Sequence, residues 1–129
     1  MNSQLEKILL VEDEPDIREV AALALEEVGG LGLETCSSGQ EAMEIVSTYN
    51  PDLLLIDVMM PGMDGPTVFQ QIKKIPGMES IPAIFMTAKV QPQEIAHYKD
   101  MGALDVIAKP FDPMLLADTI RKIWEGHDK

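Results

Sequence analysis

Runs of consecutive apolar residues recur along the chain at the length of a β-strand. The clearest are Ile8–Val11, Leu53–Ile56 and Ala83–Met86, and Val106-Ile107 is a weaker fourth. Continuous apolar runs are typical of strands buried on both faces of a parallel sheet that helices cover. The segment Leu31–Cys36 alternates more, which favours a strand at the edge of that sheet. The pattern therefore predicts a sheet of five strands.

Segments with helical spacing separate these runs. The predicted helices cover about residues 15–28, 39–50, 68–75, 91–101 and 113–123. In the first, the apolar stripe that should face inward consists of Ile17, Val20, Ala21, Ala24 and Val28.

Ser38 and Glu41 read as a capping box for the second helix, and Asp112 reads as the cap of the last. Asp64-Gly65 is a common turn pair. The helix over 91–101 has few apolar residues, so we expect it to be weakly anchored.

A strand followed by a helix, repeated five times, predicts an α/β fold. Because crossovers between parallel strands are right-handed, few topologies remain. We predict a single doubly wound (βα)5 domain of the flavodoxin-like type, with a parallel five-stranded sheet in the order 2-1-3-4-5, which puts the alternating strand at an edge. The domain is expected to cover residues 1–129, with a core over about 7–124 and no output domain.

The charge of the chain limits its partners. It has 22 Asp and Glu residues against 10 Lys and Arg, a formal net charge of -12. Phosphate backbones and anionic lipids repel such a chain, so we expect no direct nucleic-acid binding. No apolar run approaches the roughly 20 residues of a spanning helix, so no membrane insertion is expected. The N-terminus has no secretory signal and the single cysteine, Cys36, cannot form an internal disulfide, which predicts a cytoplasmic location.

Polar residues follow four of the predicted strands. Glu12-Asp13 follows the first, Asp57 the third, Thr87 the fourth and Lys109 the fifth. These strand ends meet at one edge of a parallel sheet, where ligands bind in open α/β folds. Because clustered carboxylates repel one another, the site calls for a cation, and oxygen ligands favour Mg²⁺.

The same residues suit phosphoryl transfer. With its charge offset by the metal, a carboxylate can attack phosphorus and form an aspartyl phosphate, and we assign this role to Asp57. The phosphoryl oxygens then need to be held and neutralised. Lys109 supplies a positive charge for them, and Thr87 supplies a hydroxyl donor.

Glu12-Asp13, Asp57–Gly65, Thr87-Ala88 and Lys109–Phe111 together resemble the receiver domain of two-component response regulators. The resemblance extends from about Lys7 to Trp124. It implies a stand-alone signalling switch and not an enzyme. Such a switch accepts a phosphoryl group from a phosphohistidine on a sensor histidine kinase or histidine phosphotransfer protein, and then acts on a downstream protein target.

The resemblance also assigns roles to individual residues. Asp57 is the phosphoacceptor, Asp13 a direct Mg²⁺ ligand, and Glu12 a ligand acting mostly through water. Met59 contributes its main-chain carbonyl to the metal. Thr87 and Lys109 hold the phosphoryl oxygens, and movement of Thr87 signals to the surface of the fourth helix, fifth strand and fifth helix. One position departs from the pattern, because Val106 stands where many receivers have an aromatic residue that turns inward.

Three other functions compete with a phosphorylated switch. An aspartyl-phosphate phosphatase resembles Asp-x-Asp at its nucleophile, but Met59 occupies the second position after Asp57. A flavodoxin-like cofactor binder needs a phosphate-binding loop where this chain has Glu12 and Asp13. A binding module that is never phosphorylated would not need the complete set of site residues.

Overall fold

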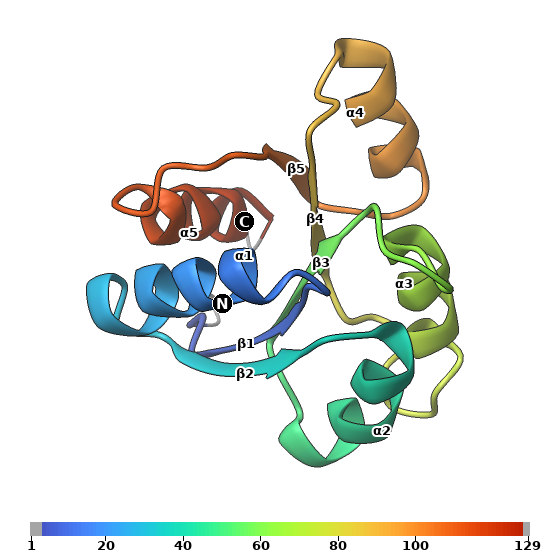
Figure 1. Ribbon diagram of the computed structural model, residues 1–129. Coiled ribbons are helices and arrows are strands. Elements are labelled where there is room, and N and C mark those ends of the chain that lie inside the picture. Colours follow the sequence, from blue (N-terminus) through green and yellow to red (C-terminus); the bar gives the residue numbers. More distant parts are fainter. Residues whose placement is uncertain (1–3, 128–129) are drawn as a thin grey trace.

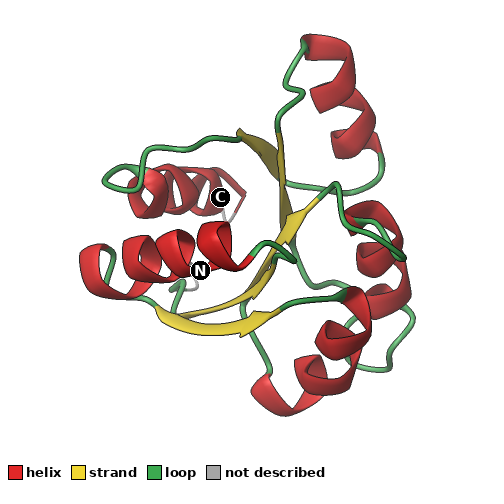
Figure 2. Ribbon diagram, viewed as in Figure 1, coloured by secondary structure: helices red, strands yellow, loops and turns green. Residues whose placement is uncertain are grey.

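A single five-stranded parallel sheet forms the centre of the computed structural model, which describes residues 4–127 (Figures 1 and 2). The strands are β1 (Lys7–Val11), β2 (Gly32–Cys36), β3 (Leu53–Asp57), β4 (Ala83–Thr87) and β5 (Asp105–Ala108). They lie in the order β2-β1-β3-β4-β5, and every neighbouring pair is parallel. The predicted fold class, strand order and edge position of the second strand are confirmed.

Helices cover both faces of the sheet. They are α1 (Pro15–Ala22), which continues as the π-helix η1 (Leu23–Val28), α2 (Gly39–Tyr49), α3 (Gly65–Lys73), α4 (Pro92–Asp100) and α5 (Leu116–His127). Figure 1 shows α1 and α5 side by side on one face and α2 and α3 on the other. In β1, Leu9 and Val11 pack into the core on the α2 and α3 side, whereas Ile8 and Leu10 pack into the core on the α1 and α5 side. This two-sided burial explains the continuous apolar runs.

The first helix differs from the predicted regular helix. Its second half is the π-helix η1, whose wider turns shift the buried face along the sequence. Leu25 is therefore buried, while Val28, predicted to face inward, is 48% exposed. Val20, also predicted to face inward, is 41% exposed, although it lies in the regular helix before η1. The apolar spacing revealed that a helix was present but not its change of pitch.

Helix ends match the sequence in one case and differ in two. Ser38 caps α2, its Oγ accepting from the Glu41 N–H at 3.2 Å. The Glu41 carboxylate accepts from the Ser37 N–H at 2.7 Å, one residue before the predicted partner, so the capping box forms in part. Asp64 is a helix cap and not only a turn residue, because its Oδ1 accepts from the Thr67 N–H at 2.9 Å at the start of α3. Asp112 does not cap the last helix. It accepts from the Met114 N–H at 2.9 Å within a turn, and α5 begins only at Leu116.

Helix α4 is the least anchored of the described helices. None of its residues is buried, and Tyr98 is its one side chain packed against a core cluster, with its ring at 90° to that of Phe85. The predicted scarcity of inward contacts is confirmed. Within residues 4–127, no helix combines the length and apolarity that crossing a membrane requires.

Candidate functional site

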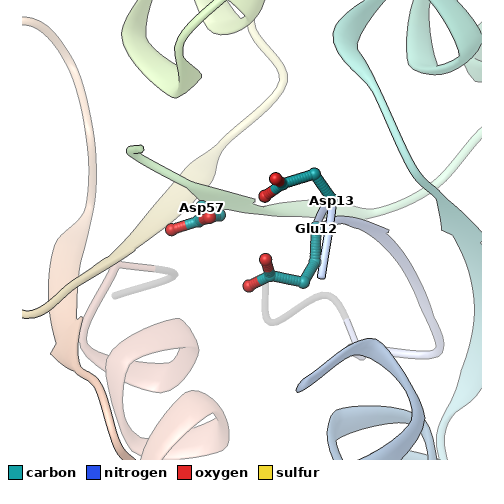
Figure 3. A group of neighbouring side chains, drawn as sticks. All are labelled: Glu12, Asp13 and Asp57. Atoms are coloured by element: carbon teal, nitrogen blue, oxygen red, sulfur yellow. The ribbon is translucent and has the colours of Figure 1, made fainter. Parts of the chain in front are cut away.

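The carboxyl ends of β1 and β3 bring three acidic residues together. Glu12 and Asp13 directly follow β1, and Asp57 is the last residue of β3. Figure 3 shows the three carboxylates gathered around a shared space. One oxygen from each lies within 4.8 Å of the others. Glu12 is 0% and Asp57 1% exposed, so solvent does little to screen their repulsion.

Lys109 supplies a positive charge to this cluster from the carboxyl end of the edge strand β5. It directly follows β5, and its Nζ lies 3.0 Å from Asp57 Oδ1 and 3.1 Å from Glu12 Oε1. Burial alone would lower the pKa of Lys109, but hydrogen bonds to Asp57 and Glu12 outweigh that effect and raise it. Lys109 is therefore held firmly in its charged form.

A single ammonium does not balance the carboxylates. The pKa of Glu12 is raised to about 7, mainly because the side chain is buried, with the Asp57 charge adding to the effect. Hydrogen bonds from the Glu14 N–H and from Lys109 act in the opposite direction. Ionised Glu12 is thus costly in this position, which is the expected state of a site that needs a further cation.

Two buried carboxylate oxygens have no hydrogen-bond partner among the described residues, namely Asp13 Oδ1 and Asp57 Oδ2. The other Asp57 oxygen, Oδ1, accepts from Lys109 and from the Met59 N–H at 3.4 Å. Buried oxygens are rarely left without a partner, so each is available for a ligand. A cluster of carboxylate oxygens that includes unpaired ones fits a hard divalent cation such as Mg²⁺.

The remaining predicted residues lie at the rim without joining this cluster. Thr87 ends β4 and is buried, and its hydroxyl accepts from the Lys89 N–H at 3.1 Å. Met59 is 72% exposed, and its main-chain N–H is the group that contacts Asp57. The role of the Met59 carbonyl in metal binding stays a prediction.

Two further residues support the site: Gly65, which the sequence marked only as part of a turn and of the matching motif, and Arg18, which the sequence did not mark. A Cβ on Gly65 would collide with the carbonyl oxygen of Asp57, because the loop folds back so that the Gly65 N–H donates to Val58 O at 3.0 Å. Arg18 Nη1 donates to Glu12 O at 2.9 Å. The Asp-Gly pair was a signal for a tight loop at Gly65, but nothing in the sequence marked Arg18.

The family comparison agrees with this arrangement. The family model of the response regulator receiver domain matches residues 8–121. The chain belongs to this family. Receiver domains are signalling switches of two-component systems, they interact with histidine kinases or phosphotransfer proteins, and they bind Mg²⁺ at an acidic pocket.

Related proteins place this receiver domain in several contexts. It is 39% identical over 120 residues to sporulation initiation phosphotransferase F of Bacillus subtilis, covering 91% of this chain and 92% of that protein. It is 36% identical over 129 residues to the probable transcriptional regulator ycf27 of Porphyra purpurea, covering all of this chain and 51% of that protein. The receiver domain thus spans about half the length of several curated relatives it matches.

Solved structures show the same fold. The chemotaxis protein CheY4 of Vibrio cholerae superposes on the receiver domain with a TM-score of 0.84 at 27% identity, covering 93% of this chain and 99% of that one. A putative response regulator from Chloroflexus aurantiacus gives a TM-score of 0.82 at 29% identity, covering 95% and 99%.

Proposed function

We propose that Asp57 is the phosphoacceptor of this receiver domain. It would take a phosphoryl group from a phosphohistidine on a sensor histidine kinase or histidine phosphotransfer protein, with Mg²⁺ bound beside it. The observation that carries the proposal is the state of the Asp57 carboxylate. Lys109 and the Met59 N–H hold its Oδ1, while its Oδ2 is buried and has no partner among the described residues.

The chemistry of transfer follows from these contacts. Asp57 Oδ2 forms a bond to phosphorus as the bond between phosphorus and the donor nitrogen breaks, and the departing imidazole keeps the electron pair. Lys109 fixes the orientation of the carboxylate before transfer and offsets the added negative charge afterwards.

The acidic cluster is the proposed binding site of the metal. When bound, Mg²⁺ neutralises charge on the phosphoryl oxygens. Asp13 and Asp57 would hold it directly, Glu12 would act mostly through water, and Met59 would lend its main-chain carbonyl. The unpaired Asp13 Oδ1 supports this assignment, because no other described group satisfies it.

Thr87 is the proposed link from the site to the partner surface. Its hydroxyl accepts from the Lys89 N–H in the loop that leads to α4. Once a phosphoryl group offers a charged acceptor, the hydroxyl can donate to it, which pulls this loop toward the site. Because α4 has no buried residue, its displacement breaks little packing. The surface of α4, β5 and α5 would then change for a downstream protein.

Phosphorylation by a small molecule tests the assignment directly. The protein is incubated with acetyl phosphate, with and without MgCl₂, and its intact mass is measured. We expect a gain of one phosphoryl group that requires Mg²⁺ and disappears in Asp57→Asn. The matched control is Asp64→Asn, which makes the same chemical change on the next loop and retains a good helix cap.

Two outcomes would contradict the proposal in different ways. If Asp57→Asn still gains the phosphoryl group, another residue is the acceptor. If the wild-type protein gains none in the presence of Mg²⁺, the chain is a binding module that acts without phosphorylation.

A further inference from the structure

We propose that Arg18 is a positioning residue for the Mg²⁺ site. It would hold the main chain of Glu12 and Asp13 so that both carboxylates stay directed at Asp57. The inference rests on the proposed function, because it concerns the metal that accompanies phosphorylation of Asp57.

Arg18 contacts the main chain at the acidic site and none of its carboxylates. Its Nη1 donates to the carbonyl oxygen of Glu12 at 2.9 Å and, more weakly, to that of Asp13 at 3.4 Å. The ion pairs found among residues 4–127 involve Lys99 and Lys109, not Arg18. Although the sequence has 22 acidic residues, Arg18 is therefore bonded to main chain at the site and not to a carboxylate.

Two main-chain hydrogen bonds restrain the turn between β1 and α1. The Glu12 N–H donates to Cys36 O at 3.0 Å and the Arg18 N–H donates to Glu14 O at 2.9 Å, but neither holds Asp13. Glu14 is the N-cap residue of α1, but its side chain makes no capping hydrogen bond, and Pro15 at the first helical position has no N–H. The Glu14 N–H donates to Glu12 Oε2 at 3.2 Å, which restrains one carboxylate only. Arg18 lies one helical turn further along α1 and reaches back to both residues. It thereby couples the acidic turn to a regular helix.

The charge and the positioning effect of Arg18 act in opposite directions on Mg²⁺. A guanidinium near the site repels a divalent cation, so its removal by charge alone would tighten Mg²⁺ binding. If Arg18 orients the ligands, its removal instead lets the turn move and weakens binding. Loss of a group that orients metal ligands commonly costs about 10- to 100-fold in affinity. The sign of the change therefore separates the two roles.

The test is a titration with MgCl₂, followed through amide NMR shifts of the acidic turn. We expect Arg18→Met, which keeps most of the aliphatic stem, to bind Mg²⁺ about tenfold more weakly than wild type. The matched control is Arg121→Met, because Arg121 also donates to a main-chain carbonyl, that of Gly29 at 2.6 Å, and has no contact with the site. It should bind Mg²⁺ as wild type does.

A second measurement separates positioning from a general loss of structure. With acetyl phosphate, Arg18→Met should need about tenfold more Mg²⁺ for half-maximal phosphorylation, yet reach the wild-type rate when Mg²⁺ saturates. Should Arg18→Met fail to fold by circular dichroism, Arg18→Lys takes its place, with a smaller loss expected because an ammonium cannot match the guanidinium geometry.

Equal or tighter Mg²⁺ binding by the folded Arg18 variant would overturn the inference while leaving the proposed function intact. The same holds if Arg121→Met weakens Mg²⁺ binding as much as Arg18→Met does. If the wild-type protein itself binds no Mg²⁺, the metal assignment of the proposed function fails, and the inference fails with it.

Discussion

Burial gives Asp57 and Glu12 properties that carboxylates on the surface do not have. Both side chains are almost completely withdrawn from solvent, and they share a single ammonium, that of Lys109. One consequence is the raised pKa of Glu12, and another is the unpaired Oδ2 of Asp57. The electrostatic state of the site thus depends on what surrounds each carboxylate.

Cys36 allows a test of burial at a residue outside the site. Burial is the main cause that raises the pKa of its thiol to about 12 from an ordinary value of 9.0, with smaller contributions from Glu41 and Glu34. The contribution of the buried thiol to the free energy of unfolding is therefore complete below pH 9.0, and it is lost as the pH rises toward about 12. At pH 9 we expect iodoacetamide to modify the folded protein at least about a hundredfold more slowly than the protein in concentrated guanidinium chloride. Equal rates would show that the thiol is not protected.

Gly65 tests how tightly the loop after β3 must close over Asp57. In Gly65→Ala the new methyl group meets main chain, which cannot rotate away as a side chain can. We expect a loss of about 1–3 kcal/mol in the free energy of unfolding, measured with urea, and slower phosphorylation of Asp57.

Gly126→Ala is the matched control for this glycine. Gly126 lies in α5, and a methyl group added there would meet no other atom within 4 Å, so alanine should stabilise by about 0.5–1 kcal/mol. If both substitutions stabilised the protein, the close approach of the loop to Asp57 would have no energetic weight.

At the scale of whole elements, the central sheet and the peripheral helices contribute differently. Strands β3 and β4 are buried along their whole length and hold Asp57 and Thr87 in fixed register. Helix α4 packs inward mainly through Tyr98. The buried strand end at Thr87 and the loosely packed helix α4 are therefore joined by a single short loop.

Val106 is the position at which we test the proposed link between Thr87 and the partner surface. It lies on β5 opposite Phe85 and is partly buried, and a valine cannot swing inward as an aromatic ring can. We expect Val106→Tyr to be phosphorylated by acetyl phosphate at the wild-type rate. The amide NMR shifts of α4 on phosphorylation should become larger, because a ring can follow Thr87. Loss of Asp57 phosphorylation in this variant would show that the site and the partner surface cannot be separated in this way.

The strands that are buried on both faces were predictable from the sequence. The continuous runs that form β1, β3 and β4 identified the strands, and the residues after them identified the acidic rim. The π-turns of η1 and the late start of α5 were not predictable, since both depend on the tertiary packing of these helices against the sheet. The same is true of Arg18, because its partners are carbonyl groups that every residue possesses.

For the molecule as a whole, the energetic cost of the net charge of -12 depends on where the acidic side chains lie. Most acidic side chains are exposed, where water screens them. In the cluster of Glu12, Asp13 and Asp57, the first and last side chains are buried and Asp13 is partly buried. Lys109 offsets only part of their charge, so a further cation should stabilise the folded protein. Stability and metal binding should therefore be linked.

Thermal unfolding measures this linkage. A Mg²⁺ concentration about ten times the dissociation constant should stabilise the protein by about 1.4 kcal/mol, which corresponds to a rise of about 5 °C in Tm. Asp13→Asn should raise the Tm of the metal-free protein, because one repelling charge is gone, and should abolish most of the Mg²⁺ effect. Asp100→Asn, an exposed control at the end of α4, should respond to Mg²⁺ as wild type does. An equal response of both variants would mean that the ion acts elsewhere.

The contacts of Lys109 join parts of the chain that are far apart in sequence, so the site requires β5 as well as β1 and β3. The two carboxylate partners of Lys109 lie 97 and 52 positions away in sequence, at the ends of β1 and β3, and β4 separates these strands from β5 in the sheet. A chain that lacks β5 cannot place the Lys109 ammonium beside Glu12 and Asp57. Under the proposed function, such a chain lacks the charge that offsets a phosphoryl group on Asp57, and we expect it not to signal.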